Sequence, residues 1–372
     1  HSEPGSSGQN PRRFPLRDDD DDDLDRGTGP RRFLLRDLTL AAKNFSDANK
    51  LGEGGFGSIY RGYLSHEDIM VAIKINSVGS RQNEVKFIGF SREGKTEYRN
   101  EVKVISSLRH RNLVKLIGWC NDETQFFLVY EFMPNGSLDS HLFDKKSILT
   151  WDVRYRIIKG VASALLYLHE ECEQCVVHRD IKPSNILLDL GFNAKLGDFG
   201  LARLMDHEQS HGSTYIAGTL GYLGPEYVMR GYLSKESDVY SFGMVALEIA
   251  CGKKVGDKVD DSYFLEWVWG LHEKSELLSG VDQMLNNEFN AKEVECLMMV
   301  GLWCSLPRSL RPSIGQAIQV LKFEGALPDL PTMMPSYFSF GDGSDARSFS
   351  STESNSSIDL IAVVPSHQDY DL

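Results

Sequence analysis

The residues with the clearest chemical potential lie between His178 and Gly200. This segment reads HRDIKPSN, then an apolar strand-like stretch, then DFG. Its side chains that carry charge or oxygen ligands are Asp180, Lys182, Asn185 and Asp198. Transfer of a phosphoryl group needs an aligned hydroxyl, oxygen ligands for Mg²⁺ and positive charge beside the transferring group. The segment therefore predicts phosphoryl transfer from ATP.

Each of these side chains suits one part of that reaction. Asp180 can accept or orient the proton of a substrate hydroxyl, and Lys182 can neutralise the transferring phosphoryl group. Asn185 and Asp198 offer oxygen ligands to Mg²⁺, with Mn²⁺ as an alternative metal. We expect Gly200 to allow the backbone reversal that directs Asp198 inward. A lysine at position 182 favours serine and threonine substrates over tyrosine.

A glycine-rich motif precedes this segment in the chain. Gly52, Gly54 and Gly57 form G-x-G-x-x-G, a pattern that also marks dinucleotide-binding folds. In those folds the third glycine opens a helix, whereas here a strand-like stretch follows at 58–61. We interpret the motif as a flap between two strands that lets the backbone approach phosphates. A plain glycine-rich hairpin is the alternative for the motif taken alone.

A second cation lies on the strand expected next, in the sequence VAIK. Lys74 sits in an apolar strand and therefore needs an anion. We pair it with Glu101, on a helix that is indicated by apolar residues at helical spacing: Tyr98, Val102, Ile105 and Leu108. The competing carboxylates are Glu84, Glu93 and Glu97. Extra residues around 83–91 leave open the alternative that Glu101 is displaced.

A phosphorylation site is expected in the loop after DFG. Arg179 reads as a buried cation with no local partner, and a phosphate on this loop would provide one. We favour Thr214, with Ser213 and Thr219 as the other candidates. Thr219 is also expected to hydrogen-bond Asp180 and to line the substrate site.

The hydrophobic patterns predict two lobes of different character. Short apolar strands up to about residue 133 indicate a small antiparallel sheet of about five strands. From about residue 134 helical patterns dominate, and they cover 151–170, 236–251, 262–272, 291–304 and 313–323. The predicted fold class is α+β, with residues 45–325 as the two-lobed domain. Residues 1–44 read as a mostly disordered acidic and basic arm with helix-like spacing at 33–45, and 326–372 as a serine-rich disordered tail.

Composition excludes several classes of protein. The net charge of −13 argues against a nucleic-acid partner, although six of the acids form one run at 18–23. No apolar stretch reaches the about 18 residues that a membrane-spanning helix needs. The six scattered cysteines fit a reducing compartment better than a disulfide framework. The chain starts at His1, so we expect a piece of a longer protein.

With these motifs in place, the sequence resembles the eukaryotic protein kinases from about residue 45 to 324. Within that family it is similar to the cytoplasmic region of plant L-type lectin-domain receptor kinases. The matching stretches are RGTGPRRF at 26–33, NKLGEGGFGSIYRGYL at 49–64, LRHRNLVKLIGWC at 108–120 and LVYEFMPNGSLDSHLF at 128–143. The resemblance implies a two-lobed serine/threonine kinase that is tethered inside the plasma membrane. It also implies a separate extracellular lectin-like domain, so carbohydrate binding is not assigned to this chain.

The resemblance also implies roles for single residues. ATP contacts are implied for Leu51, Gly52, Gly54, Gly57, Ile59, Ala72 and Lys74. Tyr130 would guard the back of the adenine pocket, while Glu131 and Met133 would offer hinge backbone groups to adenine. Asp238 would anchor the catalytic loop. Glu226 and Arg311 would form a buried ion pair, whose breakage strands a charge.

The expected partners are ATP and proteins that present Ser or Thr, and self-association would allow phosphorylation between copies. This chain alone would be soluble and cytosolic, or would lie on the cytoplasmic side of the membrane as part of a receptor. One departure from the family is Gly224, where alanine is usual before Pro225 and Glu226. Two alternatives stay open. One is a scaffold that binds ATP but transfers phosphate poorly because Glu101 is displaced, and the other is tyrosine specificity.

Overall fold

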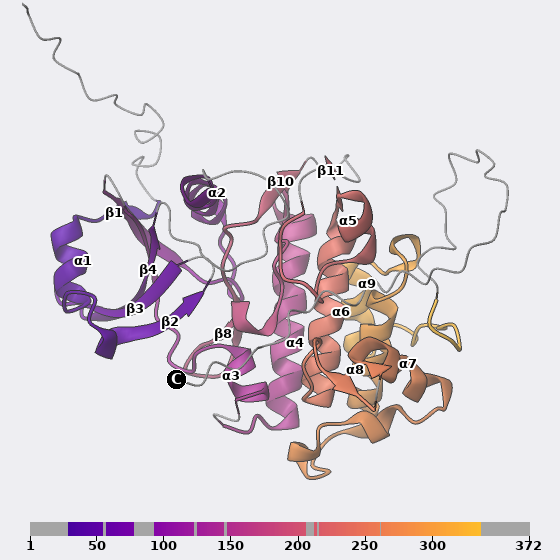
Figure 1. Ribbon diagram of the computed structural model, residues 1–372. Coiled ribbons are helices and arrows are strands. Elements are labelled where there is room, and N and C mark those ends of the chain that lie inside the picture. Colours follow the sequence, from indigo (N-terminus) through magenta and orange to yellow (C-terminus); the bar gives the residue numbers. More distant parts are fainter. Residues whose placement is uncertain are drawn as a thin grey trace, which may run out of the picture. The chain divides into compact units, whose positions relative to one another are not determined.

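The computed structural model describes residues 29–54, 57–77, 93–122, 125–144, 147–205, 212–213, 216–260 and 262–335. These residues form a small β-rich lobe followed by a larger helical lobe (Figure 1). The α+β class that the sequence predicts is confirmed. The change of character falls after strand β6, close to the expected residue 133.

The small lobe is built on a sheet of six strands in the order β1-β5-β6-β4-β3-β2. The strands are β1 (Arg31–Arg32), β2 (Lys50–Gly54), β3 (Gly57–Leu64), β4 (Ile69–Ser77), β5 (Leu116–Asn121) and β6 (Gln125–Glu131). Five of them pair antiparallel, as expected, while β1 is an additional strand that runs parallel to β5 at the edge. The glycine motif joins β2 to β3, which matches the predicted flap between two strands.

The two faces of this sheet belong to different hydrophobic clusters. Side chains alternate across a strand, so Val71 and Ile73 of β4 face one side while Ala72 and Lys74 face the other. Val71 and Ile73 join a small outer cluster. Ala72 packs against the main core, which also includes Val102 of helix α2 (Glu93–Ser107). Helix α2 therefore covers the inner face of the sheet, toward the cleft.

The outer face is covered by residues that precede the domain we expected. Helix α1 (Leu35–Ala41) lies beside strand β3 (Figure 1), and a 3₁₀ turn (Asp47–Asn49) follows. Phe33, Leu38 and Ala42 are buried in the outer cluster. The helix agrees with the helix-like spacing at 33–45, but residues 31–44 are ordered parts of the small lobe and not a disordered arm. Residues 1–28 lie outside the described residues.

Helices dominate the larger lobe. They are α3 (Leu138–Leu142), α4 (Trp151–Leu166), α5 (Pro225–Arg230), α6 (Lys235–Cys251), α7 (Phe264–Glu273), α8 (Ala291–Cys304) and α9 (Ile314–Leu321). Helix α4 continues as one π-helical turn (Tyr167–Glu171). The helix expected over 262–272 begins later, because Ser262–Tyr263 pairs as strand β14 with β13 (Lys258–Val259).

Helix α6 lies at the centre of this lobe, and its residues 237–251 are all buried. It begins where the N–H of Ser234 donates to Ser237 Oγ at 3.3 Å, and it ends at Gly252, whose φ of +63° favours glycine. Gly243 lets helix α8 approach closely, since a Cβ at this position would lie 2.6 Å from Cys304 Cβ.

Short strand pairs fix the ends of the loops near the boundary between the lobes. Strand β7 (Cys175–Val177) pairs with β10 (Arg203–Met205), and β8 (Ile186–Leu188) pairs with β9 (Ala194–Leu196). The remaining short pair is β11 (Gly212–Ser213) with β12 (Tyr232–Leu233). The loops that carry Asp180 and Asp198 therefore begin and end on fixed strands. Among the described helices, none combines the length and the apolar character that spanning a membrane requires.

Candidate active site

Three charged side chains meet in the cleft: Lys74 and Glu101 are buried, and Asp198 is partly exposed. Lys74 Nζ lies 2.8 Å from Glu101 Oε2 and 2.8 Å from Asp198 Oδ1. The predicted pairing of Lys74 with Glu101 is therefore present, and Glu101 of α2 is not displaced. The extra residues at 83–91 lie outside the described part of the chain. Asp198 comes from the larger lobe, so this ammonium joins the two lobes.

Burial and charge act in opposite directions on these groups. Burial disfavours the charged form of Lys74, but the carboxylates of Asp198 and Glu101 outweigh burial and raise the pKa of the ammonium. Burial also opposes ionisation of Asp198, yet the nearby ammonium of Lys74 brings the pKa of this carboxyl below its ordinary value. The arrangement keeps Lys74 protonated and Asp198 ionised, which suits a site for a nucleotide and its metal.

Tyr130 adds a contact that the sequence did not reveal. The resemblance placed it at the back of the adenine pocket, on β6. Its hydroxyl donates a hydrogen bond to Glu101 Oε1, while Lys74 binds the other oxygen of the same carboxylate. Burial and the Glu101 carboxylate raise the pKa of the Tyr130 phenol well above its usual range, so the phenol remains a donor. Glu101 is thus fixed from two sides.

Three polar side chains surround Asp180. Asn185 Nδ2 donates to the backbone oxygen of Asp180 at 2.8 Å and to its Oδ2 at 2.9 Å. Lys182 Nζ lies 2.9 Å from the same Oδ2. Thr219 Oγ1 donates to Asp180 Oδ1 at 2.6 Å and accepts from Lys182 Nζ at 2.7 Å. The predicted hydrogen bond between Thr219 and Asp180 is therefore present.

Asp238 of helix α6 holds the backbone of this loop. It is fully buried, and it accepts hydrogen bonds from the N–H groups of His178 at 2.7 Å and Arg179 at 2.9 Å. Arg179 has a φ of +73°, a strained value for a residue with a side chain. The two bonds to Asp238 stabilise that conformation. The anchoring contact expected for Asp238 is therefore present.

The backbone reversal at the DFG segment occurs two residues earlier than expected. The sequence suggested that Gly200 provides it, but Asp198 itself has a φ of +63°. His178 supports this turn, because its Nε2 lies 3.0 Å from the carbonyl oxygen of Gly197 and its ring packs edge-on against Phe199. Aspartate tolerates the left-handed region better than most residues do, which explains why no glycine is needed here.

The expectation that Arg179 has no local partner is wrong. Arg179 Nη2 donates to the hydroxyl of Tyr227 at 2.6 Å, and Nη1 donates to the carbonyl oxygen of Leu201 at 3.2 Å. Of the expected phosphorylation sites, Thr214 lies outside the described residues, and only the backbone of Ser213 is described, in β11.

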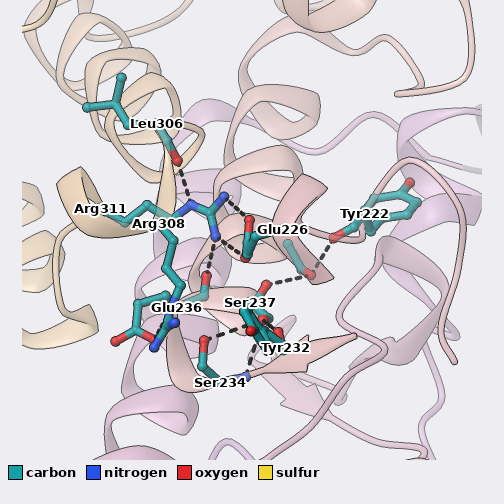
Figure 2. A network of polar contacts seen from close by, with 10 residues as sticks. Tyr222, Glu226, Tyr232, Ser234, Glu236, Ser237, Leu306, Arg308 and Arg311 are labelled. Carbon is teal, nitrogen blue, oxygen red and sulfur yellow. Dashed lines mark hydrogen bonds and ion pairs between the residues drawn. The ribbon is translucent and has the colours of Figure 1, made fainter. Parts of the chain in front are cut away.

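Glu226 and Arg311 form the ion pair that the resemblance implied. Arg311 Nη1 and Nη2 lie 2.7 and 2.8 Å from the two carboxylate oxygens of Glu226. Figure 2 shows the guanidinium also reaching the carbonyl oxygen of Leu306, at 2.6 Å, and the backbone of Glu236. Every donor nitrogen of this side chain is thus used, and the pair ties the start of α5 to the loop before α9.

The residues expected to contact the nucleotide lie on several elements of the small lobe and just beyond its last strand. The positions are Leu51, Gly52 and Gly54 on β2, Gly57 and Ile59 on β3, Ala72 and Lys74 on β4, and Tyr130, Glu131 and Met133 at the end of β6 and just beyond it. Gly57 has a φ of +121°, and a Cβ there would lie 2.0 Å from the carbonyl oxygen of Ile75, so only glycine fits. The Glu131 carboxylate binds Lys195 Nζ at 2.9 Å, which links the hinge to β9.

Asp198 and Asn185 offer the oxygen atoms that a divalent metal requires. Asp198 has a carboxylate oxygen that Lys74 does not use, and Asn185 turns its amide nitrogen toward Asp180, which leaves its oxygen as a ligand. Among the described residues there is no cluster of three or more His, Cys, Asp or Glu side chains that could hold a metal ion. One carboxylate and one amide oxygen fit Mg²⁺, which takes few protein ligands and completes its shell with phosphate and water.

Fold, buried lysine and catalytic loop together define a phosphotransferase of the two-lobed type. The chain belongs to the protein kinase family, since the protein kinase domain matches residues 45–321. The kinase region is similar to that of L-type lectin-domain containing receptor kinases, which confirms the predicted resemblance.

Three relatives illustrate the similarity. L-type lectin-domain containing receptor kinase IX.1 of Arabidopsis thaliana is 58% identical over 321 residues, which cover 84% of this chain and 48% of that protein. L-type lectin-domain containing receptor kinase SIT2 of Oryza sativa subsp. japonica is 47% identical over 317 residues, covering 84% and 45%. A probable LRR receptor-like serine/threonine-protein kinase of Arabidopsis is 44% identical over 324 residues, covering 86% and 30%. This chain thus spans less than half of each relative.

Proposed function

We propose that this chain is an ATP-dependent serine/threonine protein kinase and the signalling part of a plant lectin-type receptor kinase. The observation that carries the proposal is the joint geometry of the cleft. Lys74 bridges Glu101 and Asp198 at 2.8 Å, while Lys182 and Thr219 both contact the Asp180 carboxylate. Protein kinases need such a lysine pair and such a loop to be in place at the same time.

The chain's own residues divide the work of phosphoryl transfer. Asp180 orients the substrate hydroxyl and receives its proton, since the carboxylate is fixed by Asn185 and Thr219. Lys182 lies beside that carboxylate and offsets negative charge on the transferring group. Lys74 holds the non-transferred phosphates. A bound Mg²⁺, or Mn²⁺ in its place, would be held by Asp198 and Asn185 and would neutralise charge on the phosphate oxygens.

Serine and threonine are the proposed substrate residues. The Lys182 ammonium and the Thr219 hydroxyl, 2.7 Å apart, both lie at the Asp180 carboxylate. A short aliphatic hydroxyl would have to approach this carboxylate closely. The same proposal includes phosphorylation of Thr214 between self-associating copies. It also includes a position on the cytoplasmic side of a plasma membrane, and the relatives that support this position are named receptor kinases.

A direct assay of phosphate transfer tests the proposal. The purified chain is incubated with γ-labelled ATP, Mg²⁺ and a protein substrate beside the variants Asp180→Asn and Lys74→Ala. We expect transfer to serine and threonine, and a loss of about 10²-fold or more in each variant, because proton acceptance or phosphate positioning is removed. Asp260→Asn and Lys258→Ala make the same substitutions at exposed positions and should retain full activity.

Two outcomes would contradict the proposal. If the unmodified chain incorporates no more label than Asp180→Asn while it still binds ATP, the chain acts as a nucleotide-binding scaffold. If phosphotyrosine is the main product, the assignment to serine and threonine is wrong.

A further inference from the structure

Residues 30–45 form a continuous layer on the small lobe. All of them except residue 45 precede the part of the chain that matches the protein kinase domain. We call them the docking strap. The strap contains β1 and α1 and lies on the outer face of the sheet (Figure 1). Its first strand adds to β5 in parallel, with Arg31 opposite Gly118 and Arg32 opposite Trp119. The N–H of Phe33 then donates to the carbonyl oxygen of Trp119 at 2.8 Å.

Gly118 makes room for this strap. A Cβ at position 118 would lie 2.2 Å from the carbonyl oxygen of Arg31 and 2.4 Å from the ring of Phe33. Real side chains do not tolerate such distances, and the first neighbour is backbone that cannot turn away. Because Gly118 lies in extended strand β5, its role here is to leave space for a second backbone. The glycine is therefore matched to the strap and not to the sheet alone.

The apolar side chains of the strap are buried in the outer cluster, to which β4 also contributes residues. Leu38 and Ala42 are completely buried and Phe33 is nearly so, in a cluster that contains Val71 and Ile73. Both of these β4 residues are completely buried as well. The exposed end of the strap adds polar contacts, because Arg31 pairs with Glu67 and Arg32 Nη2 donates to Asn121 Oδ1 at 3.1 Å.

Strand β4 connects the strap to the chemistry. Val71 and Ile73 face the strap, and Lys74, the next residue, faces the cleft, where it binds Glu101 and Asp198. Packing behind a strand restricts the position of side chains on its front face, since protein interiors transmit small displacements. The strap therefore supports Lys74 through a single strand.

We propose that the docking strap is a positioning segment for phosphoryl transfer: by packing behind β4 it holds Lys74 in place for the nucleotide phosphates. This inference rests on the proposed kinase activity and deepens it, because it assigns part of the reaction to residues ahead of the kinase domain. Loss of the strap leaves the kinase motifs intact but weakens binding of ATP.

The test uses the full chain with Gly118→Ala, which adds one methyl group in the path of the strap. Gly270→Ala in α7 is the matched control, since nothing lies within 4 Å of a Cβ there. Hydrogen exchange in a peptide covering 69–77 should rise in Gly118→Ala and stay unchanged in the control. The KM for ATP should rise and kcat should fall, so that kcat/KM falls about tenfold or more.

Binding of ATP with Mg²⁺, measured by calorimetry, separates this role from a merely structural one. A partly unfolded sample would lose binding sites at an unchanged Kd, whereas a displaced Lys74 raises Kd with a full number of sites. If Gly118→Ala leaves Kd and exchange at 69–77 unchanged, the inference is overturned. Because binding needs no transfer, this result is independent of whether the proposed kinase activity holds.

A second variant protects the test against a general defect in β5. Phe33→Ala weakens the strap from the other side of the same contact. If both substitutions act by releasing the strap, their effects on the Kd for ATP should be less than additive in the double variant. Full additivity would show that Gly118→Ala acts on β5 alone, and it would refute the positioning role.

Discussion

Single residues in this protein tie loops to helices through buried charges. Asp238 of α6 holds the loop that bears Arg179, and Arg311 near α9 holds Glu226 at the start of α5. Each charge has several partners, as burial requires. The ion pair of Glu226 and Arg311 is the clearest case, because the Arg311 side chain is fully shielded from solvent.

Substitution Glu226→Gln should therefore destabilise the protein strongly. It keeps the shape of the side chain but leaves the buried Arg311 guanidinium without a counter-charge, and we expect unfolding to become easier by about 3–5 kcal/mol. Urea unfolding measures the change. Glu288→Gln makes the same substitution at an exposed site and should stay within about 0.5 kcal/mol of the unmodified chain. A similarly small effect at Glu226 would show that the pair is not a stability determinant.

Contacts between opposite charges are easier to predict from the sequence than contacts between a charged and a neutral residue. Lys74 and Glu101 could be matched because a buried lysine requires an acid on a neighbouring element. The partner of Arg179 could not be inferred, since Tyr227 is a neutral residue 48 positions away. Nor does the sequence indicate that Asp198 adopts a positive φ, because the glycine two residues later offers a simpler explanation for a turn.

At the scale of elements, close packing of α6 on α8 depends on small residues. A Cβ at Gly243 would lie 2.6 Å from Cys304 Cβ and 2.9 Å from the carbonyl oxygen of Gly301. Both helices are central to the larger core, so neither can move away without opening space elsewhere.

Gly243→Ala should lower stability although alanine is the better helix former. Overpacking lowers the free energy of unfolding by about 1–3 kcal/mol, and the better helix propensity of alanine raises it by about 1 kcal/mol. In Gly270→Ala, where α7 leaves the added methyl free, only the propensity gain remains, and stability should rise. Chemical denaturation of the two variants should thus give shifts of opposite sign. Equal signs would mean that the α6–α8 contact relaxes easily.

Long elements with a periodic hydrophobic pattern could be predicted from the sequence, whereas short elements could not. The expected helix over 291–304 has the bounds found for α8. Strand β1 has two residues, too few for any alternation, and it exists because β5 offers an edge. A glycine inside a strand is nevertheless a signal of close backbone approach, and Gly118 in β5 could have indicated the docking strap.

At the scale of the whole molecule, one acid in the core makes stability depend on pH. Glu248 of α6 is completely buried, and it accepts hydrogen bonds from the Tyr222 hydroxyl at 2.8 Å and the Val255 N–H at 2.9 Å. Burial is the main cause that raises the pKa of this carboxyl from 4.5 to about 8, although both hydrogen bonds act against burial.

The sign of the pH effect follows from that shift. Between pH 4.5 and about 8 the folded chain holds a proton on Glu248 that the unfolded chain has released. The stabilisation is complete below pH 4.5 and is lost as pH rises toward 8, at up to about 1.4 kcal/mol per pH unit. Glu248→Gln removes this dependence, so the stability difference between the two proteins should narrow or reverse from pH 5 to 8 in urea titrations. A constant difference would mean that Glu248 is ionised when folded.

The two backbone hydrogen bonds to Asp238 have a consequence for protein engineering. The conformation of HRDIKPSN depends on hydrogen bonds to a helix about 60 residues further along the chain. The residues of the segment itself do not fix it. Grafting this eight-residue segment onto another protein would transfer the reactive side chains without the geometry that phosphoryl transfer requires. The smallest transferable unit is the segment together with α6 and the core that encloses it.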